Sequence, residues 1–288
     1  MEIVGHEEIR RKLTNLVKEK KVGHAYLFYG KEGIGKKLVA QEFAKNMMCL
    51  QPVEGVSCGK CESCQQFGNN ADFQMITPEN NIIKVDTIRA FEEEVFLKPT
   101  NSERKCFIID DSEWMNESSQ NALLKVLEEP PEYVSIILIS SHKEKLLYTI
   151  LSRVTEIDFK PLNEIQMKRI VSDKQAVYIP YAGGSVEKLL KLASDDYIQL
   201  AENLLDVFLT KDFLAINRKI NEIKKDKTLK DNMNQILETL VIVCYQRLRM
   251  NVDVYRNFIQ IIEKTNNNLQ KNANLELALD NMMTQICY

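Results

Sequence analysis

Short apolar runs alternate with amphipathic stretches up to residue 160 of the chain. The apolar runs have the length of buried strands and lie at residues 25–29, 73–77, 106–109, 134–139 and 154–159. Hydrophobic residues at helical spacing predict helices between them, at residues 7–20, 36–48, 86–96 and between Asn116 and Pro130. Fully apolar strands in this rhythm predict an α/β fold, with a parallel sheet covered by helices on both faces.

The strand pattern ends at Pro161. Residues 163–205 predict short helices around the turn Gly183-Gly184, and helical spacing continues from residue 206 to the last residue. Within that part we expect the Lys/Asp-rich stretch 223–231 to be a solvated connection. The sequence therefore predicts three domains: an α/β domain (1–162) with an irregular insertion at 49–64, a small helical lid (163–205) and an all-helical C-terminal domain (206–288).

The charge and composition of the chain argue against a strongly basic nucleic-acid-binding protein, a membrane protein and a secreted protein. The chain has 288 residues and a net charge of −3, so no global positive field attracts nucleic acid. No stretch approaches the ~20 apolar residues of a membrane span, and we expect no membrane partner. The first residues lack the basic and apolar regions of a signal peptide, and we therefore expect a cytoplasmic protein.

A glycine-rich segment follows the first predicted strand and precedes a predicted helix. Gly30, Gly33 and Gly35 allow backbone N–H groups to face phosphate oxygens, and Lys36 would reach the β- and γ-phosphates. Lys37 stands where a Ser or Thr hydroxyl normally coordinates Mg²⁺, and an ammonium cannot do so. The pattern indicates a nucleotide-binding fold with a degenerate site. The alternative is a glycine turn without a ligand.

Asp110 and Asp111 end the third predicted strand, where nucleotidases keep a metal-orienting Asp and a water-activating Glu. Asp110 fits the first position, whereas Asp111 is one methylene shorter than Glu. Catalytic geometry is sensitive to displacements of about 1 Å, so this change damages an ATPase site. The alternative is that both residues cap the following turn. Together with the upstream loop, they favour the remnant of a nucleotide site.

Four cysteines lie close together in the predicted insertion: Cys49, Cys58, Cys61 and Cys64. Four thiolates at this spacing favour tetrahedral zinc, and a full protein ligand set is typical of a structural site. Free thiols or a redox pair are the alternatives.

At this point the residues resemble one family, the AAA+ subunits of the bacterial DNA polymerase III clamp loader. Residues 23–28 look like the entry to its glycine loop, and the cysteine spacing resembles its zinc module. Residues 121–131 are similar to its most recognisable helix, and Leu151-Ser152-Arg153-Val154 resembles its Ser-Arg-Cys motif. The resemblance implies an AAA+ fold with a zinc module, a helical lid and a C-terminal collar domain. It is dense over residues 1–160 and thin afterwards.

Within the family, the chain resembles the non-hydrolysing delta-prime type. Lys37 and Asp111 depart from the ATPase pattern, and Lys188 replaces the arginine of the second nucleotide sensor. The resemblance implies no intrinsic catalysis, weak or absent ATP/ADP binding, and an arginine finger, Arg153 with Ser152, donated to a neighbouring ATPase subunit. Ser140 and Ser141 occupy the first-sensor position and are expected to be vestigial.

The implied partners are gamma/tau-like ATPases and a delta-like subunit, with the sliding clamp and primed DNA reached through the complex. Two alternatives remain open at this point. One is an ATP-hydrolysing gamma/tau-like motor subunit, and the other is a zinc-bearing interaction protein outside replication.

Overall fold

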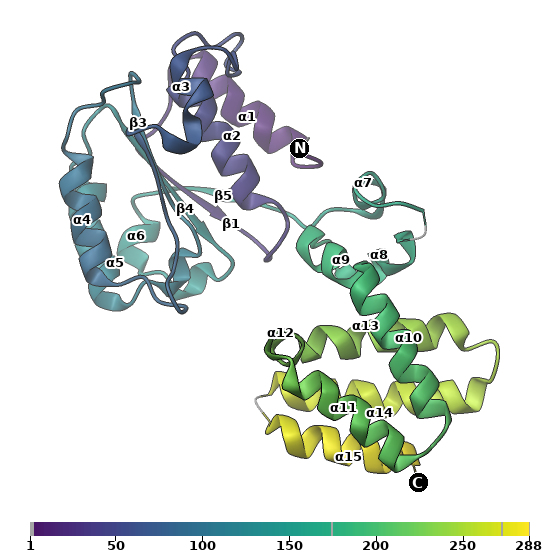
Figure 1. Ribbon diagram of the computed structural model, residues 1–288. Helices are drawn as coiled ribbons and strands as arrows, with labels where there is room; N and C mark the ends of the chain where they lie inside the picture. The colour runs from purple at the N-terminus through teal and green to yellow at the C-terminus, as the bar shows by residue number, and fades with distance from the viewer. Residues whose placement is uncertain (1–2, 174, 272, 288) are drawn as a thin grey trace. The chain divides into compact units, whose positions relative to one another are not determined.

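The computed structural model describes residues 3–173, 175–271 and 273–287, which divide into two compact units (Figure 1). The first unit extends to Ile170 and also includes Gly184–Val186. The second unit comprises Val171–Gly183 and the chain from Glu187 onward.

A five-stranded parallel sheet forms the centre of the first unit. Its strands are β1 (Ala25–Tyr29), β2 (Phe73–Ile76), β3 (Lys105–Ile109), β4 (Val134–Ser140) and β5 (Thr155–Asp158). They lie in the order β2-β3-β4-β1-β5, so the loops after β1, β3 and β4 meet at one edge of the sheet. The predicted strands and their parallel arrangement are confirmed, with end points that shift by one residue or less.

Helices cover both faces of this sheet, as the fully apolar strands predict. The helices of the first unit are α1 (Glu7–Lys18), α2 (Lys36–Met48), α3 (Glu62–Gln65), α4 (Val85–Val95), α5 (Glu117–Glu128), α6 (Tyr148–Leu151) and α7 (Glu164–Lys168). Phe91 of α4 and Leu123 of α5 share one buried cluster with Leu27 of β1. On the other face, the ring centroids of Phe43 in α2 and Tyr26 in β1 are 5.3 Å apart.

Asn116 caps α5 as predicted, since its side chain accepts a hydrogen bond of 2.9 Å from the backbone N–H of Ser119. The predicted insertion is less irregular than expected, because α3 begins within it, at Glu62. The turn Gly183-Gly184 has φ values of 57° and 79°, in the region that glycine adopts most readily.

The second unit is helical. Its helices are α8 (Ile179–Ala182), α9 (Val186–Leu192, apart from its first residue), α10 (Asp195–Leu209), α11 (Phe213–Lys225), α12 (Lys227–Asp231), α13 (Met233–Arg247), α14 (Val252–Gln270) and α15 (Leu275–Cys287). Leu240 and Cys244 of α13 are fully buried in a core shared with Phe258 of α14 and Met282 of α15. These apolar residues of α13 therefore belong to the hydrophobic core of the second unit.

The prediction of a solvated connection at 223–231 is wrong. Ile223 is buried in the core of the second unit, so α11 continues to Lys225. Asp226 then caps α12, because its side chain accepts a hydrogen bond of 3.1 Å from the backbone N–H of Leu229. The predicted boundary between residues 205 and 206 lies inside α10, and the three-domain division stays a prediction.

None of the helices formed by the described residues is long and apolar enough to cross a membrane.

Candidate functional site

The glycine-rich loop joins β1 to α2 at the carboxyl edge of the sheet. Gly30, Gly33 and Gly35 have φ values of 146°, 71° and 101°. Gly30 is also constrained by space, because a Cβ there would lie 2.3 Å from the carbonyl oxygen of Phe159. Gly35 precedes α2, and a Cβ there would meet no atom within 4 Å. The predicted strand, loop and helix N-terminus of a phosphate-binding site are thus present.

The side chain of Lys36 turns back into this loop. Its Nζ donates hydrogen bonds to the carbonyl oxygens of Gly30 (2.7 Å) and Lys31 (2.8 Å), and to Oγ of Ser141 (3.0 Å). Burial lowers the pKa of Lys36, and the carboxylate of Glu113 is the largest opposing influence. The ammonium is therefore bound by groups of the chain itself, and a phosphate would have to compete with them.

Lys37 lies beside the acidic end of β3. Its Nζ is 2.9 Å from Oδ2 of Asp110, whose side chain is only 11% exposed. The carboxylate that the sequence placed in the metal-orienting position thus already has a cationic partner. An ammonium at this place supplies positive charge but no lone pair, so it opposes a divalent ion next to Asp110.

Asp111 follows in the left-handed region, with φ of 46°. Burial, followed by the charges of Asp110 and Glu113, raises the pKa of Asp111 to about 6. Glu113 is a member of this acidic group that the sequence did not predict. Its Oε1 accepts a hydrogen bond of 2.9 Å from the backbone N–H of Ser141, and Oε2 is buried without a partner among the described residues.

Ser140 and Ser141, which the sequence placed at the first-sensor position, differ in what they contact. Ser141 reaches the loop through its bond from Lys36, whereas Oγ of the fully buried Ser140 accepts a hydrogen bond of 3.0 Å from the N–H of His142. Lys188 belongs to the second unit, where its Nζ lies 2.7 Å from Oε2 of Glu238.

Arg153 follows α6 on the surface of the first unit. Its Nη2 donates to Oε1 of Glu128 (2.8 Å), and its Nη1 donates to the carbonyl oxygen of Thr149 (2.9 Å) and to Oγ of Ser152 (3.2 Å). The hydroxyl of Ser152 donates to the same carbonyl of Thr149, at 3.0 Å. The guanidinium, with a side chain 34% exposed, is therefore held in one orientation at the surface.

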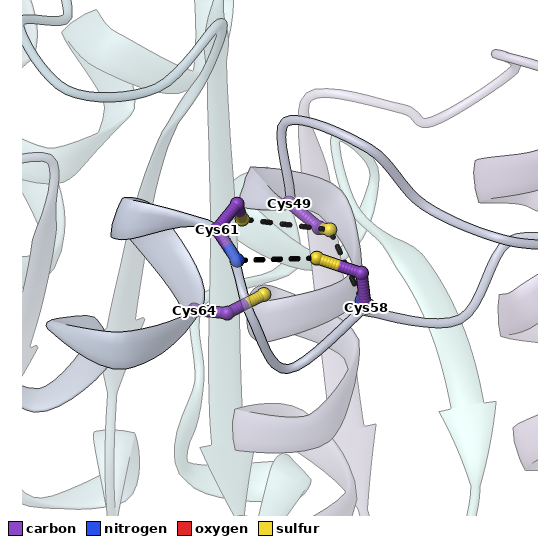
Figure 2. Close-up of side chains that lie close together, drawn as sticks. All are labelled: Cys49, Cys58, Cys61 and Cys64. Carbon is purple, nitrogen blue, oxygen red and sulfur yellow. Dashed lines mark hydrogen bonds between the residues drawn. The ribbon is translucent and has the colours of Figure 1, made fainter.

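The four predicted cysteine ligands come together from three segments (Figure 2). Cys49 directly follows α2, and Cys58 lies in the loop between α2 and α3. Cys61 directly precedes α3, and Cys64 lies within it. Their sulfur atoms all lie within 4.8 Å of one another, and those of Cys49 and Cys61 are 3.9 Å apart. Metal–sulfur bonds of about 2.3 Å in a tetrahedron require sulfur separations of about 3.8 Å, so the cluster fits a metal with four thiolate ligands.

Backbone N–H groups support the thiolate form of Cys58. The N–H groups of Lys60 and Cys61 donate to Sγ of Cys58 at 3.5 and 3.3 Å, and these bonds lower the pKa of Cys58 to about 6. Burial raises the pKa of Cys64 to about 12. A cation among the four sulfurs would supply the positive charge that keeps the buried thiols deprotonated.

Sequence comparison connects this chain to subunits of DNA polymerase III. Residues 5–163 match the family model described as DNA polymerase III, delta subunit. The tau/gamma subunit of Haemophilus influenzae DNA polymerase III is 37% identical over 198 residues, which cover 67% of this chain and 28% of that protein. The tau subunit of Bacillus subtilis DNA polymerase III is 33% identical over 258 residues, which cover 83% of this chain and 45% of that protein. The chain thus spans less than half the length of these relatives.

Among solved structures, a gamma subunit-related protein of DNA polymerase III from Thermotoga maritima has a TM-score of 0.54 and 21% identity, over 98% of both chains. At that identity the likeness supports the fold alone. The family model, in contrast, matches more than half of the chain and includes the whole parallel sheet, the glycine loop and the cysteine cluster. The chain belongs to the DNA polymerase III delta subunit family.

Proposed function

We propose that this chain is a non-motor, delta-prime-like subunit of the clamp loader that places the sliding clamp on primed DNA during chromosomal replication. The observation that carries the proposal is the ion pair between Lys37 and Asp110, at 2.9 Å. In an ATPase of this fold, a hydroxyl and a carboxylate at these positions hold Mg²⁺. Here one position is a cation and the other is already neutralised by it.

The rest of the loop supports weak or absent ATP and ADP binding. Lys36, the residue expected to meet β- and γ-phosphates, donates to two loop carbonyls and to Ser141. Phosphate binding would have to replace these bonds and would bring negative charge toward Asp111 and Glu113. Without a well-held metal and an oriented water, phosphoryl transfer loses both positioning and charge stabilisation. We therefore expect no intrinsic catalysis.

Arg153 is the residue we propose to act in catalysis, at the site of a neighbouring subunit. A guanidinium supplied in trans stabilises the charge of a γ-phosphate in the transition state. Arg153 belongs to the Ser-Arg pair of the family motif and stays partly exposed, with Ser152 hydrogen-bonded to it. In its own unit, the carboxylate at the expected Mg²⁺ position is already paired with Lys37, so the charge of Arg153 serves little purpose there.

The cysteine cluster is proposed to bind one structural Zn²⁺. Cys49, Cys58, Cys61 and Cys64 supply four soft ligands, and a set of four leaves no open position for a substrate. Zinc would tie the end of α2 to α3, so its contribution is to the local fold of the insertion.

The proposed partners are gamma/tau-like ATPase subunits and a delta-like subunit, joined through the helices of residues 206–288 as a collar. The sliding clamp and primed DNA would be reached through that complex, in the cytoplasm. The alternative function is an ATP-hydrolysing gamma/tau-like motor. It is favoured by the names of the curated relatives and by the retained Lys36 and Asp110.

Hydrolysis measurements test the proposal. The purified chain should hydrolyse Mg²⁺-ATP far below about 1 per second, and turnover at or above that rate would establish the motor alternative instead. In a complex reconstituted with its ATPase partners, Arg153→Ala should lower DNA- and clamp-stimulated hydrolysis while assembly by gel filtration stays normal. Arg89→Ala is the matched control, because Arg89 is an exposed arginine of α4 in the same unit. Equal rates for the two variants would remove the trans-acting function of Arg153.

A further inference from the structure

We propose that Glu128 is a positioning residue that orients Arg153 toward the nucleotide of a neighbouring subunit. The inference rests on the trans-acting function proposed above for Arg153. Glu128 is the last residue of α5, and Arg153 is 25 positions further along the chain. The two side chains meet in the folded first unit with an Nη2–Oε1 distance of 2.8 Å.

The contacts of the guanidinium leave part of it available to a ligand. An arginine has five N–H donors in a planar fork. Within the described part of the chain, Nη1 uses two donors on Thr149 and Ser152, and Nη2 uses one on Glu128. Nε–H and the second N–H of Nη2 remain for a further acceptor. A phosphate can accept two parallel N–H groups of one arginine, with two of its oxygens.

Glu128 restrains the side of the guanidinium that Thr149 and Ser152 do not contact. Thr149 and Ser152 both bind Nη1, and both lie within four residues of Arg153, so they anchor one corner of the fork. Glu128 binds the other terminal nitrogen and comes from a different helix. With both corners held, rotation of the guanidinium about its long stem is restricted. The group is thereby preorganised, which reduces the reorganisation needed when charge develops on the phosphate.

The pair has little to contribute to the stability of the fold. The side chain of Glu128 is 52% exposed and that of Arg153 is 34% exposed, and ion pairs in such surroundings add little to folding. A variant at Glu128 should therefore fold and assemble, so its effect on hydrolysis can be measured without an accompanying change in stability.

Glu129 offers a matched control. It is the next residue after Glu128, carries the same charge and is exposed, and no contact with Arg153 is found for it among the described residues. Glu128→Ala and Glu129→Ala make the same change in composition and net charge. A difference between them isolates the contact with Arg153 from the general loss of an acidic side chain.

The experiment measures pre-steady-state ATP hydrolysis by the reconstituted complex with clamp and primed DNA. Glu128→Ala should lower the rate constant of the site that Arg153 serves by about tenfold, with the ATP concentration that gives the half-maximal rate unchanged, because a displacement of about 1 Å in a catalytic group has effects of that order or larger. Glu128→Gln keeps an acceptor oxygen and should recover part of the loss. Glu129→Ala should match the unmodified complex.

A double-variant comparison distinguishes the two proposals. If Glu128 acts through Arg153, then Glu128→Ala should cause no further loss in a chain that already carries Arg153→Ala. Wild-type hydrolysis by Arg153→Ala alone would overturn the proposed function of Arg153. A loss for Arg153→Ala with equal rates for Glu128→Ala and Glu129→Ala would overturn only the positioning inference. Faster hydrolysis by Glu128→Ala would also overturn it, since Glu128 would then restrain Arg153 rather than orient it.

Discussion

Replacing Lys37 by threonine should give the glycine loop a metal-dependent interaction with ATP. The substitution removes the cation beside Asp110 and introduces the hydroxyl that coordinates Mg²⁺ in nucleotide sites of this fold. In the wild-type chain, the ammonium of Lys37 and a Mg²⁺ ion compete for the same carboxylate. We therefore expect Mg²⁺ to leave ATP affinity unchanged in the wild-type chain and to raise it in Lys37→Thr.

The expected change in the free energy of unfolding follows from the unequal burial of Lys37 and Asp110. The side chain of Lys37 is 47% exposed, whereas that of Asp110 is 11% exposed. Loss of Lys37 leaves a nearly buried carboxylate without its partner, which should lower the free energy of unfolding by about 1–3 kcal/mol in EDTA. Bound Mg²⁺-ATP should then stabilise the variant, by about 2.7 kcal/mol when the ligand is at 100 times its Kd.

Lys37→Val is the control, because valine has the shape of threonine without the hydroxyl. Urea unfolding and ATP titration would be measured for the three proteins in EDTA and in Mg²⁺. Both variants should lose stability in EDTA, and only Lys37→Thr should regain it with Mg²⁺-ATP. Indistinguishable responses of the two variants to Mg²⁺-ATP would refute the reasoning, as would tight Mg²⁺-dependent binding by the wild-type chain.

Three further predictions concern the metal and the stability of the first unit. The native protein should contain about one zinc per chain by elemental analysis, and Cys61→Ser should lose it while Cys287→Ser, outside the cluster, keeps it. Asp111→Asn should raise the free energy of unfolding by about 1 kcal/mol at pH 8, because burial raises the pKa of Asp111 to about 6 and disfavours its charged form in the folded state, while solvent at the partly exposed side chain reduces this penalty. The gain should disappear below about pH 4, where the side chain is protonated in both states; a gain that persists there in urea unfolding would contradict this cause. Gly30→Ala should lower the free energy of unfolding by more than about 2 kcal/mol, since its Cβ would lie 2.3 Å from a backbone oxygen, whereas Gly59→Ala meets open space and should cost about 1 kcal/mol.

The sheet could be predicted from the sequence because every strand is a short apolar run between turn residues. β3 and β4 are buried along their whole length, which is the environment their composition predicts. The charged stretch 223–231 misled the prediction, since Ile223 is buried and Asp226 caps a new helix turn. Local composition indicates solvation, but it does not reveal which single residues anchor or cap a helix.

The residues of the candidate site were predictable where a motif spacing carries the chemistry. The glycine loop and the four cysteines have such spacings, and the structure brings the cysteine sulfurs within 4.8 Å of one another. Glu113 has none, and the helix motif at residues 121–131 did not indicate a partner for Glu128; each meets its partner, Ser141 or Arg153, only through the tertiary fold. The pairing of Lys37 with Asp110 was also beyond reach, since the sequence indicated only that lysine could not serve as a metal ligand.

The side chains of Lys36 and Lys37 both contact groups of the chain itself, at the glycine loop and at the end of β3. Lys36 donates to two loop carbonyls and Lys37 lies 2.9 Å from Asp110, so a phosphate would compete with those carbonyls for Lys36, and Mg²⁺ would compete with Lys37 for Asp110. A motor subunit couples nucleotide binding to conformational change, because the ligand makes contacts that differ between its two states. In the proposed function, this competition leaves a nucleotide little differential binding energy with which to drive such a change. The same arrangement suits a subunit that keeps one conformation and presents Arg153 from a fixed surface, which is the function proposed for this chain.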